Sequence, residues 1–174
     1  RKAVVIGGGL LGLEAARGLA KRKLDVTVVH RMAWLMEQQL DAAAGALLRD
    51  AMQRLGVRVL LERNTLRVEG EAASESSRVR RVVLEGNETL DADLLVIATG
   101  IRPRVELARE AGLEVKRGIV VDDFLRTSDR SIFAVGECVE HRGKSYGLVA
   151  PLYEQGLSLA HALHDDESRP YRGS

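Results

Sequence analysis

The sequence predicts an α/β fold built on a parallel sheet, and three observations lead to it. Lys2 to Ile6 is a short, mostly apolar run that ends in glycines, as a buried strand does before a tight turn. Leu10 to Arg22 follows a helical pattern rich in small residues, which let a helix lie close to a sheet. Val26 to Val29 is a β-branched run typical of a second buried strand. Together these segments predict a βαβ unit of ~30 residues with a right-handed crossover.

The next segments extend the same sheet. Apolar residues recur at helical spacing over 40–55, with Asp41 placed to cap the start of the helix and Gly56 to end it. Residues 57–61 are expected to form a third parallel strand, and residues 94–97 return to the parallel pattern.

Between these strands the pattern changes to short strand-like runs at 66–68, 79–84 and 89–90. Gly86-Asn87 indicates a turn between the last two runs, and the small polar residues at 71–77 indicate a mobile loop. We therefore expect a small antiparallel meander beside the parallel sheet.

Pro103 marks a natural boundary in the chain. We expect one domain at 1–102, a second at 103–164 and a charged tail or linker at 165–174. The second domain is expected to hold a helix over 105–111, strands at 119–121 and 132–135, and a helix over 151–163.

The composition excludes several classes of function. With 26 basic and 25 acidic residues the net charge is +1, which gives no reason to expect a nucleic acid or membrane partner. Cys138 is the single cysteine, so the chain holds neither an internal disulfide nor a CxxC metal or redox site, and no metal ligands are predicted. No apolar run is long enough to span a bilayer and no signal peptide precedes the first strand, so we expect a cytoplasmic protein. The missing initiator Met indicates a piece of a longer protein.

Residues 7–12, Gly-Gly-Gly-Leu-Leu-Gly, satisfy G-x-G-x-x-G between a predicted strand and a predicted helix, which is the context that the motif requires. Gly7 allows the tight turn, Gly9 lets a pyrophosphate approach the backbone, and Gly12 lets the helix pack on the strand. The free N–H groups at the helix start, including those of Leu10 and Leu11, then face the phosphates. The motif predicts a Rossmann-like dinucleotide site; the alternative is a glycine-rich turn that binds nothing.

The end of the second strand bears on the choice of coenzyme. An acidic residue there accepts a hydrogen bond from the ribose 2′-OH of NAD, but this chain has His30 and then Arg31, and no acid. The absence of a carboxylate permits NADP, whose 2′-phosphate Arg31 could bind through charge-assisted hydrogen bonds. In the alternative, Arg31 is solvated and His30 touches the ribose or nothing. The sequence is therefore compatible with either NAD or NADP.

Three segments together resemble the two-dinucleotide-binding flavoproteins of the pyridine nucleotide-disulfide oxidoreductase family. They are residues 7–16, Ala98-Thr99-Gly100 and residues 132–137, and the resemblance extends over about residues 2–163. It implies an NAD(P)-binding domain with an antiparallel meander, followed by the C-terminal half of an FAD-binding domain. The first half of the FAD domain would precede Arg1, so FAD would be shared with that missing N-terminal segment.

The resemblance also implies cofactor contacts. Residues 127–137 are similar to the family's second FAD segment, in which an Asp usually bonds the ribitol; here Gly136 is followed by Glu137, which keeps the acceptor on a longer side chain. Residues 146–151 resemble the segment that places helix N–H groups near the flavin. Glu14 matches the acid near the nicotinamide, and Thr99 and Gly100 complete the expected cofactor-binding set. Solvated acids are the alternatives for Glu14 and Glu137.

Within the family, residues 30–41 and 136–155 are closest to the large subunit of assimilatory NAD(P)H nitrite reductases, while rubredoxin and ferredoxin reductases share the general pattern. The resemblance implies hydride transfer from NAD(P)H to FAD, and then electron transfer to iron–sulfur and sirohaem centres or to a small electron carrier. The cofactors carry that chemistry, so no catalytic residue is predicted. The alternatives are a rubredoxin or ferredoxin reductase, a disulfide reductase with a cysteine pair upstream, and a non-catalytic NAD(P)-binding sensor.

Three conspicuous features are given structural rather than chemical interpretations. Residues 34–36, Trp-Leu-Met, are expected to pack at a domain surface instead of forming a cofactor box. Cys138 is expected to be a small buried filler, and His141 an ordinary loop residue.

Overall fold

The computed structural model describes residues 1–71, 78–164 and 166–173. The chain forms two compact units, Arg1–Gly100 and Ile101–Ser174. Except for Glu71, the loop expected at 71–77 lies outside the described residues. None of the helices in the described ranges is long and apolar enough to cross a membrane.

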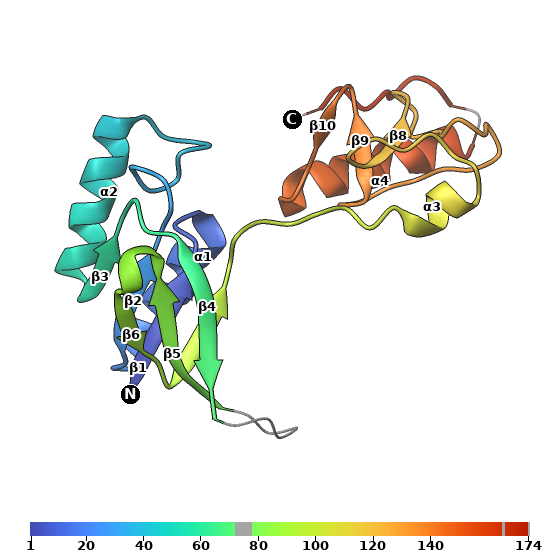
Figure 1. Cartoon of the computed structure of the whole chain (residues 1–174). Helices are drawn as coiled ribbons and strands as arrows, with labels where there is room; N and C mark the ends of the chain where they lie inside the picture. Colours follow the sequence, from blue (N-terminus) through green and yellow to red (C-terminus); the bar gives the residue numbers. More distant parts are fainter. Residues whose placement is uncertain (72–77, 165, 174) are drawn as a thin grey trace. The chain divides into compact units, whose positions relative to one another are not determined.

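A four-stranded parallel sheet forms the centre of the first unit, with strand order β3-β2-β1-β7 (Figure 1). β1 (Lys2–Ile6) pairs in parallel with β2 (Asp25–Val29) and with β7 (Leu94–Ile97), and β2 also pairs in parallel with β3 (Val57–Leu60). The four strands expected from the apolar runs are therefore present, and β1 is an inner strand. Parallel pairing brings the carboxyl ends of β1, β2 and β7 to the same edge of the sheet.

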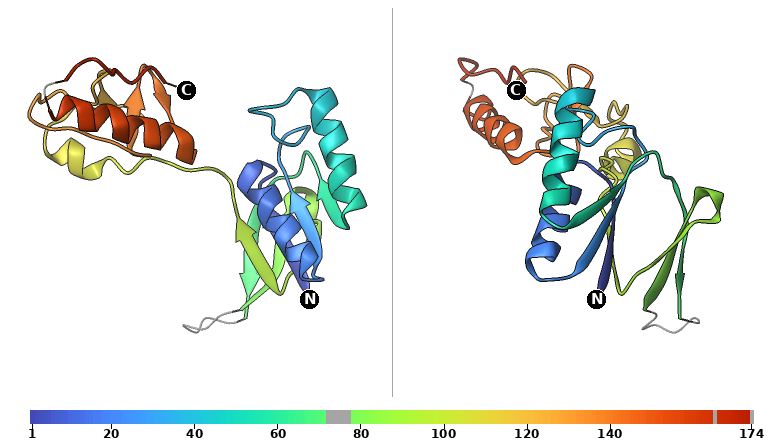
Figure 2. Two further views of the ribbon diagram at one scale, coloured as in Figure 1. Left: turned by 180° about the vertical axis from the view of Figure 1, so that it is seen from behind. Right: turned by 90° about the vertical axis from the view of Figure 1, so that its left-hand side faces the viewer.

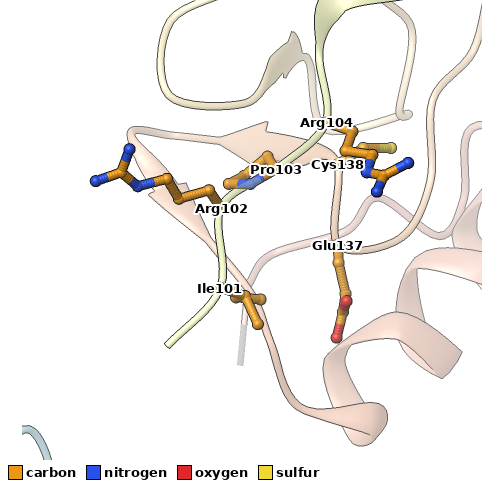
Figure 3. Close-up of a pocket in the computed structure, with 6 residues that line it drawn as sticks. All are labelled: Ile101, Arg102, Pro103, Arg104, Glu137 and Cys138. Atoms are coloured by element: carbon orange, nitrogen blue, oxygen red, sulfur yellow. The ribbon is translucent and has the colours of Figure 1, made fainter. Parts of the chain in front are cut away.

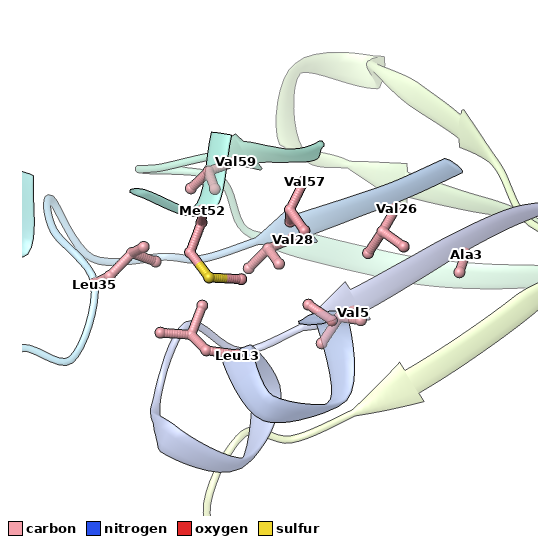
Figure 4. Close-up of a cluster of buried hydrophobic side chains, with 10 residues drawn as sticks. Ala3, Val5, Leu13, Val26, Val28, Leu35, Met52, Val57 and Val59 are labelled. Atoms are coloured by element: carbon pink, nitrogen blue, oxygen red, sulfur yellow. The ribbon is translucent and has the colours of Figure 1, made fainter. Parts of the chain in front are cut away.

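Two helices cover one face of this sheet. α1 (Leu10–Lys21) links β1 to β2, and α2 (Ala42–Arg54) precedes β3. The Asp41 carboxylate accepts a hydrogen bond from the Ala44 N–H at 2.8 Å, so Asp41 is the N-cap predicted from the sequence. Figure 4 shows side chains of the core between the helices and the sheet. This core contains Ala3, Val5, Leu13, Ala16, Val26, Val28, Leu35, Met52, Val57 and Val59.

An antiparallel meander of β4 (Thr65–Gly70), β5 (Val79–Leu84) and β6 (Thr89–Asp91) covers the opposite face of the sheet. Figure 2 shows the meander and the two helices on opposite sides of the parallel sheet. A second apolar cluster joins the layers, and it contains Val4, Val29, Val82, Leu84, Leu90 and Ala92. The turn expected at Gly86-Asn87 is a short 3-10 segment over Glu85–Asn87, in which Gly86 has a φ of +81°. The predicted meander is confirmed.

A three-stranded sheet and two helices build the second unit. β8 (Ile119–Val121) pairs in parallel with β9 (Val139–His141), and β9 pairs antiparallel with β10 (Lys144–Ser145). α3 (Glu106–Glu110) precedes this sheet, and α4 (Val149–Ala162) follows it. Both helices lie where the sequence predicts them, with α4 beginning two residues early.

The strand expected over 132–135 is wrong. Phe133 forms only an isolated bridge with Arg126. The segment folds back on the residues just before it, because the Thr127 N–H bonds the Ile132 carbonyl and the Ala134 N–H bonds the Leu125 carbonyl. The ladder is formed instead by β9 and β10, whose short runs are largely polar and give no strand pattern in the sequence.

Residues 166–173, expected to belong to a tail or linker, include an anchored aromatic side chain. Tyr171 is 2% exposed and packs in a cluster with Val121, Leu125 and Val139. Its N–H donates to the Asp123 carbonyl at 2.7 Å. The sequence did not predict this contact, because charged residues surround Tyr171.

The Asp123 side chain ties β9 to the loop after β8. It accepts hydrogen bonds from the Arg142 guanidinium at 2.6 and 3.0 Å and lies 2.8 Å from Nε2 of His141, which is fully buried. The bonds from Arg142 and His141 hold the pKa of the Asp123 carboxyl below its usual value. Asp123 therefore stabilises the fold above the unfolded-state pKa of about 3.9, and this contribution is lost as the pH falls through the lower folded-state value.

We expect Asp123→Asn to lower the free energy of unfolding at pH 7 by about 1–3 kcal/mol, since the charged partner of Arg142 is removed and the bond to buried His141 is weakened. Thermal unfolding from pH 7 to pH 3 measures the effect. The gap between the variant and the natural protein should narrow toward pH 3. A constant gap would contradict this role.

Candidate dinucleotide-binding site

The glycine loop leaves β1 at the shared carboxyl edge of the sheet. Gly7 has a φ of +118°, and its N–H donates to the Val29 carbonyl at 2.9 Å. A Cβ at Gly7 would lie 2.2 Å from the carbonyl oxygen of Ala98, at the end of β7. Both the backbone conformation and the lack of space therefore require glycine at this position.

Gly12 and Gly9 are glycines for different reasons. A Cβ at Gly12 would lie 2.1 Å from the Gly7 carbonyl oxygen, so α1 packs directly on the loop. A Cβ at Gly9 would meet no heavy atom within 4 Å, and the φ of −83° at Gly9 suits any residue. Nothing in the described chain explains a glycine at position 9, whereas a ligand lying against the backbone would.

The start of α1 is suited to an anion. Gly9 is its N-cap, and neither a side-chain cap nor an acidic residue occupies the first turn. Leu10 and Leu11, which follow it, are 41% and 63% exposed. The partial positive charge of the helix N-terminus therefore faces an open loop.

His30 lies beneath this loop with 6% of its surface exposed. Its Nδ1 accepts a hydrogen bond from the Gly8 N–H at 3.1 Å. Accepting at Nδ1 places the proton of a neutral imidazole on Nε2, which donates to Oε2 of Glu37 at 3.1 Å. The alternatives drawn from the sequence included neither partner, because Glu37 is seven residues away and no local pattern links the two side chains.

The segment between β2 and α2 folds back over the glycine loop. The Met36 N–H donates to the Gly8 carbonyl at 3.0 Å, and the Trp34 indole N–H donates to the Leu40 carbonyl at 2.9 Å. Leu35 is fully buried and enters the core beside Met52 (Figure 4). Leu35 therefore serves in packing, as expected for residues 34–36, but it packs in the core of the first unit and not at a domain surface.

The remaining predicted residues of the first unit follow the same sheet edge or the helix that begins there. Arg31 follows β2, while Thr99 and Gly100 follow β7, and all three are exposed. Glu14 is exposed on α1, two residues after Gly12. The topology thus brings Arg31, Thr99 and Gly100 to the edge where the glycine loop lies.

In the second unit, Gly136 and Glu137 lie between Phe133 and β9. Gly136 has a φ of +106°, and its N–H donates to Oε1 of Gln155 at 2.8 Å. Gln155 is fully buried on α4, and no local sequence pattern marks it as a functional residue. Glu137 is exposed and lines a shallow pocket (Figure 3). The pocket residues are Ile101, Arg102, Pro103, Arg104, Glu137 and Cys138.

Two further expectations for this unit have different outcomes. Cys138 was expected to be a small buried filler, but it is only half-buried, and its Sγ lies 3.6 Å from the Val135 carbonyl oxygen. His141 was expected in a loop, and this is wrong, because His141 ends β9 and is fully buried against Asp123 and Tyr171.

The family model of the pyridine nucleotide-disulphide oxidoreductases matches residues 1–164. The chain belongs to this family. The resemblance inferred from residues 7–16, 98–100 and 132–137 is thereby confirmed. Membership in a family named for oxidoreductases disfavours the alternative of a non-catalytic nucleotide sensor.

Two proteins of Bacillus subtilis (strain 168) illustrate the relation within the pyridine nucleotide-disulphide oxidoreductases. The chain is 49% identical over 174 residues to a nitrite reductase [NAD(P)H], and 47% identical over 174 residues to an assimilatory nitrate reductase electron transfer subunit. Each comparison covers 100% of this chain but only 21% and 22% of the relatives. The chain thus spans about a fifth of their length.

Solved structures of the family confirm the predicted fold class. The ferredoxin reductase for the CYP199A2 system from Rhodopseudomonas palustris superposes with a TM-score of 0.87 at 32% identity, over 99% of this chain and 43% of the other. An FAD-dependent pyridine nucleotide-disulphide oxidoreductase from Desulfovibrio vulgaris gives a TM-score of 0.87 at 36% identity, over 97% of this chain and 43% of the other.

Proposed function

We propose that this chain is the electron-entry part of a longer NAD(P)H-dependent flavoprotein. The observation that carries the proposal is the glycine loop, which is open at Gly9 and lies over the start of α1 in a member of the pyridine nucleotide-disulphide oxidoreductases. When bound, NAD(P)H supplies a hydride and FAD accepts it. The chain's own groups bind and orient the two cofactors.

For NAD(P)H, we assign the pyrophosphate to the backbone of Gly9, Leu10 and Leu11, because the α1 N-terminus favours an anion there. Gly7 and Gly12 shape that loop through their contacts with the backbone around it. Glu14 is assigned to the nicotinamide end, in keeping with the family resemblance.

For FAD, we assign Gly136 and Glu137, whose positions are supported by the bond from Gly136 to Gln155 and by the exposure of Glu137. The start of α4 at Val149 would direct backbone N–H groups toward the flavin. Thr99 and Gly100, which follow β7 in the first unit, are proposed as cofactor contacts on the family resemblance alone. The rest of the FAD site would come from outside this chain, in accord with the greater length of the relatives.

The whole protein is proposed to be an assimilatory nitrite reductase of the cytoplasm, in which electrons pass from the flavin to iron–sulfur and sirohaem centres. The two Bacillus subtilis relatives, one of them named as an electron transfer subunit, support this choice. A second candidate is a reductase of a small carrier protein. It is favoured by the 38% identity over 162 residues to the rubredoxin-NAD(+) reductase of Ectopseudomonas oleovorans, of which the chain spans 40%.

The visible absorption spectrum of the purified full-length protein separates these candidates. Flavin and sirohaem bands together, with bleaching of the flavin on addition of NADH or NADPH, are the result expected for a nitrite reductase. Flavin bands that bleach without sirohaem would move the function to a carrier-protein reductase. A protein without bound flavin would contradict the proposed function.

A further inference from the structure

We propose that Glu37 supplies the carboxylate that recognises the adenosine ribose, and that the site therefore prefers NADH to NADPH. The inference rests on the proposed function, because it requires a dinucleotide on the glycine loop. Dinucleotide-binding folds usually take this acid from the end of the second strand. In this chain that position is His30, and the fold brings an acid to it from further along the sequence.

The hydrogen-bond chain from the glycine loop fixes where the carboxylate lies. The Gly8 N–H bonds Nδ1 of His30, and Nε2 of His30 bonds Oε2 of Glu37 at 3.1 Å. The Glu37 carboxylate is therefore one imidazole ring away from the backbone of the loop. Among the described residues Glu37 is bonded through Oε2, which leaves Oε1 to accept from a ribose hydroxyl.

The side chains of His30 and Glu37 differ in how far they are buried. The side chain of His30 is 7% exposed, whereas that of Glu37 is 21% exposed. The imidazole thus lies below the surface as a positioning group, and the Glu37 side chain is partly exposed. A half-buried carboxylate that keeps a free oxygen beside a dinucleotide loop is suited to accept from the two hydroxyls of a ribose.

The segment that carries Glu37 is held on both sides of it. Met36 bonds the Gly8 carbonyl, Leu35 is fully buried in the core, and the Trp34 indole bonds the Leu40 carbonyl. These anchors do not depend on a ligand. The carboxylate consequently has a defined position relative to the glycine loop before the coenzyme binds.

The charge of Glu37 determines the preference. Two ribose hydroxyls donate to a carboxylate, whereas a 2′-phosphate would bring further negative charge against it. Arg31 would favour NADPH, because it is exposed, follows β2, and carries a positive charge suited to a phosphate. Glu37 and Arg31 therefore predict opposite preferences, and the firmer placement of Glu37 favours NADH.

Dissociation constants of NAD⁺ and NADP⁺ for the full-length protein test the inference without turnover. We expect the natural protein to bind NAD⁺ more tightly. Glu37→Gln keeps the side-chain length and an acceptor for His30 but removes the charge. It should therefore weaken the binding of NAD⁺ about tenfold and leave the binding of NADP⁺ unchanged or tighter. Glu62→Gln is the matched control, since Glu62 is exposed and its N–H bonds the Met32 carbonyl of the same segment. It should leave the ratio of the two constants unchanged.

Several outcomes would overturn the inference. An unchanged ratio in Glu37→Gln, or equal weakening of both dinucleotides, would assign Glu37 a structural role only. If the natural protein prefers NADP⁺ and Arg31→Ala selectively weakens the binding of NADP⁺, the 2′-phosphate lies at Arg31 instead. A folded, flavin-containing natural protein that binds neither dinucleotide would contradict the proposed function, and the inference with it.

Discussion

Gly9→Val is expected to weaken dinucleotide binding by more than about 100-fold, equivalent to roughly 2.7 kcal/mol, and to leave the fold intact. The reason is the contrast in surroundings at this position. A Cβ at Gly9 would meet no heavy atom within 4 Å, and the backbone angles there are open to any residue, so we expect the chain itself to tolerate a side chain. The same side chain would occupy the space through which a pyrophosphate reaches the N–H groups of α1.

Titration of the full-length Gly9→Val protein with NADH and NADPH, together with its thermal unfolding curve, measures both parts of this prediction. Gly18→Val is the matched control, because Gly18 also lies on α1, is exposed, and would bring an added Cβ within 4 Å of no heavy atom. It should lower helix stability slightly and leave binding unchanged. Unaltered affinity in Gly9→Val would refute the assignment of the loop.

Gly12→Ala should have the opposite effect, a loss of the fold's stability. The added Cβ would lie 2.1 Å from the Gly7 carbonyl oxygen, and this clash is with backbone, not with the far end of a flexible side chain. Overpacking of this kind costs about 1–3 kcal/mol or more, whereas alanine in place of glycine gains up to ~1 kcal/mol in helix propensity. We therefore expect a net loss of about 2 kcal/mol, which lowers the melting temperature of a unit of this size by roughly 8–16 °C.

Circular dichroism of Gly12→Ala during heating checks this value, and Gly18→Ala serves as the control for helix propensity alone, since Gly18 has open space around it. The control should be as stable as the natural protein or more so. If Gly12→Ala were equally stable, α1 would have to move away from the loop without cost, and the packing explanation for Gly12 would fail.

Much of the first unit could be predicted from the sequence because its signals are local. β1, β5 and β7 have the predicted bounds, since each is a short run rich in Val, Ile or Leu. The glycine loop could also be predicted, because the spacing of Gly7, Gly9 and Gly12 between a strand and a helix is a local pattern. Local patterns of this type report which faces are buried and where the backbone must turn.

The parts that could not be predicted depend on partners far apart in the chain or on side-chain geometry. Phe133 lies in a run with strand character, yet backbone bonds close its segment into a turn before a ladder can form. Gln155 reaches Gly136 across 19 residues, and Glu37 meets His30 only because Leu35 and Met36 fold the intervening segment back. The hydrophobic periodicity of a sequence does not predict such contacts.

Gly8 has a consequence for the thermodynamics of association. Its N–H is bonded to His30 and its carbonyl to the Met36 N–H, so both neighbouring peptide planes are oriented by the protein alone. Ordering one flexible residue costs about 1–2 kcal/mol in conformational entropy, and a glycine-rich segment would otherwise incur this cost each time a coenzyme arrives. In this chain the backbone of Gly8 is already ordered when the protein folds, so this entropy is not lost again on binding. Coenzyme binding can then proceed with little loss of backbone freedom, and the Gly8 amide should exchange slowly with deuterium even without ligand.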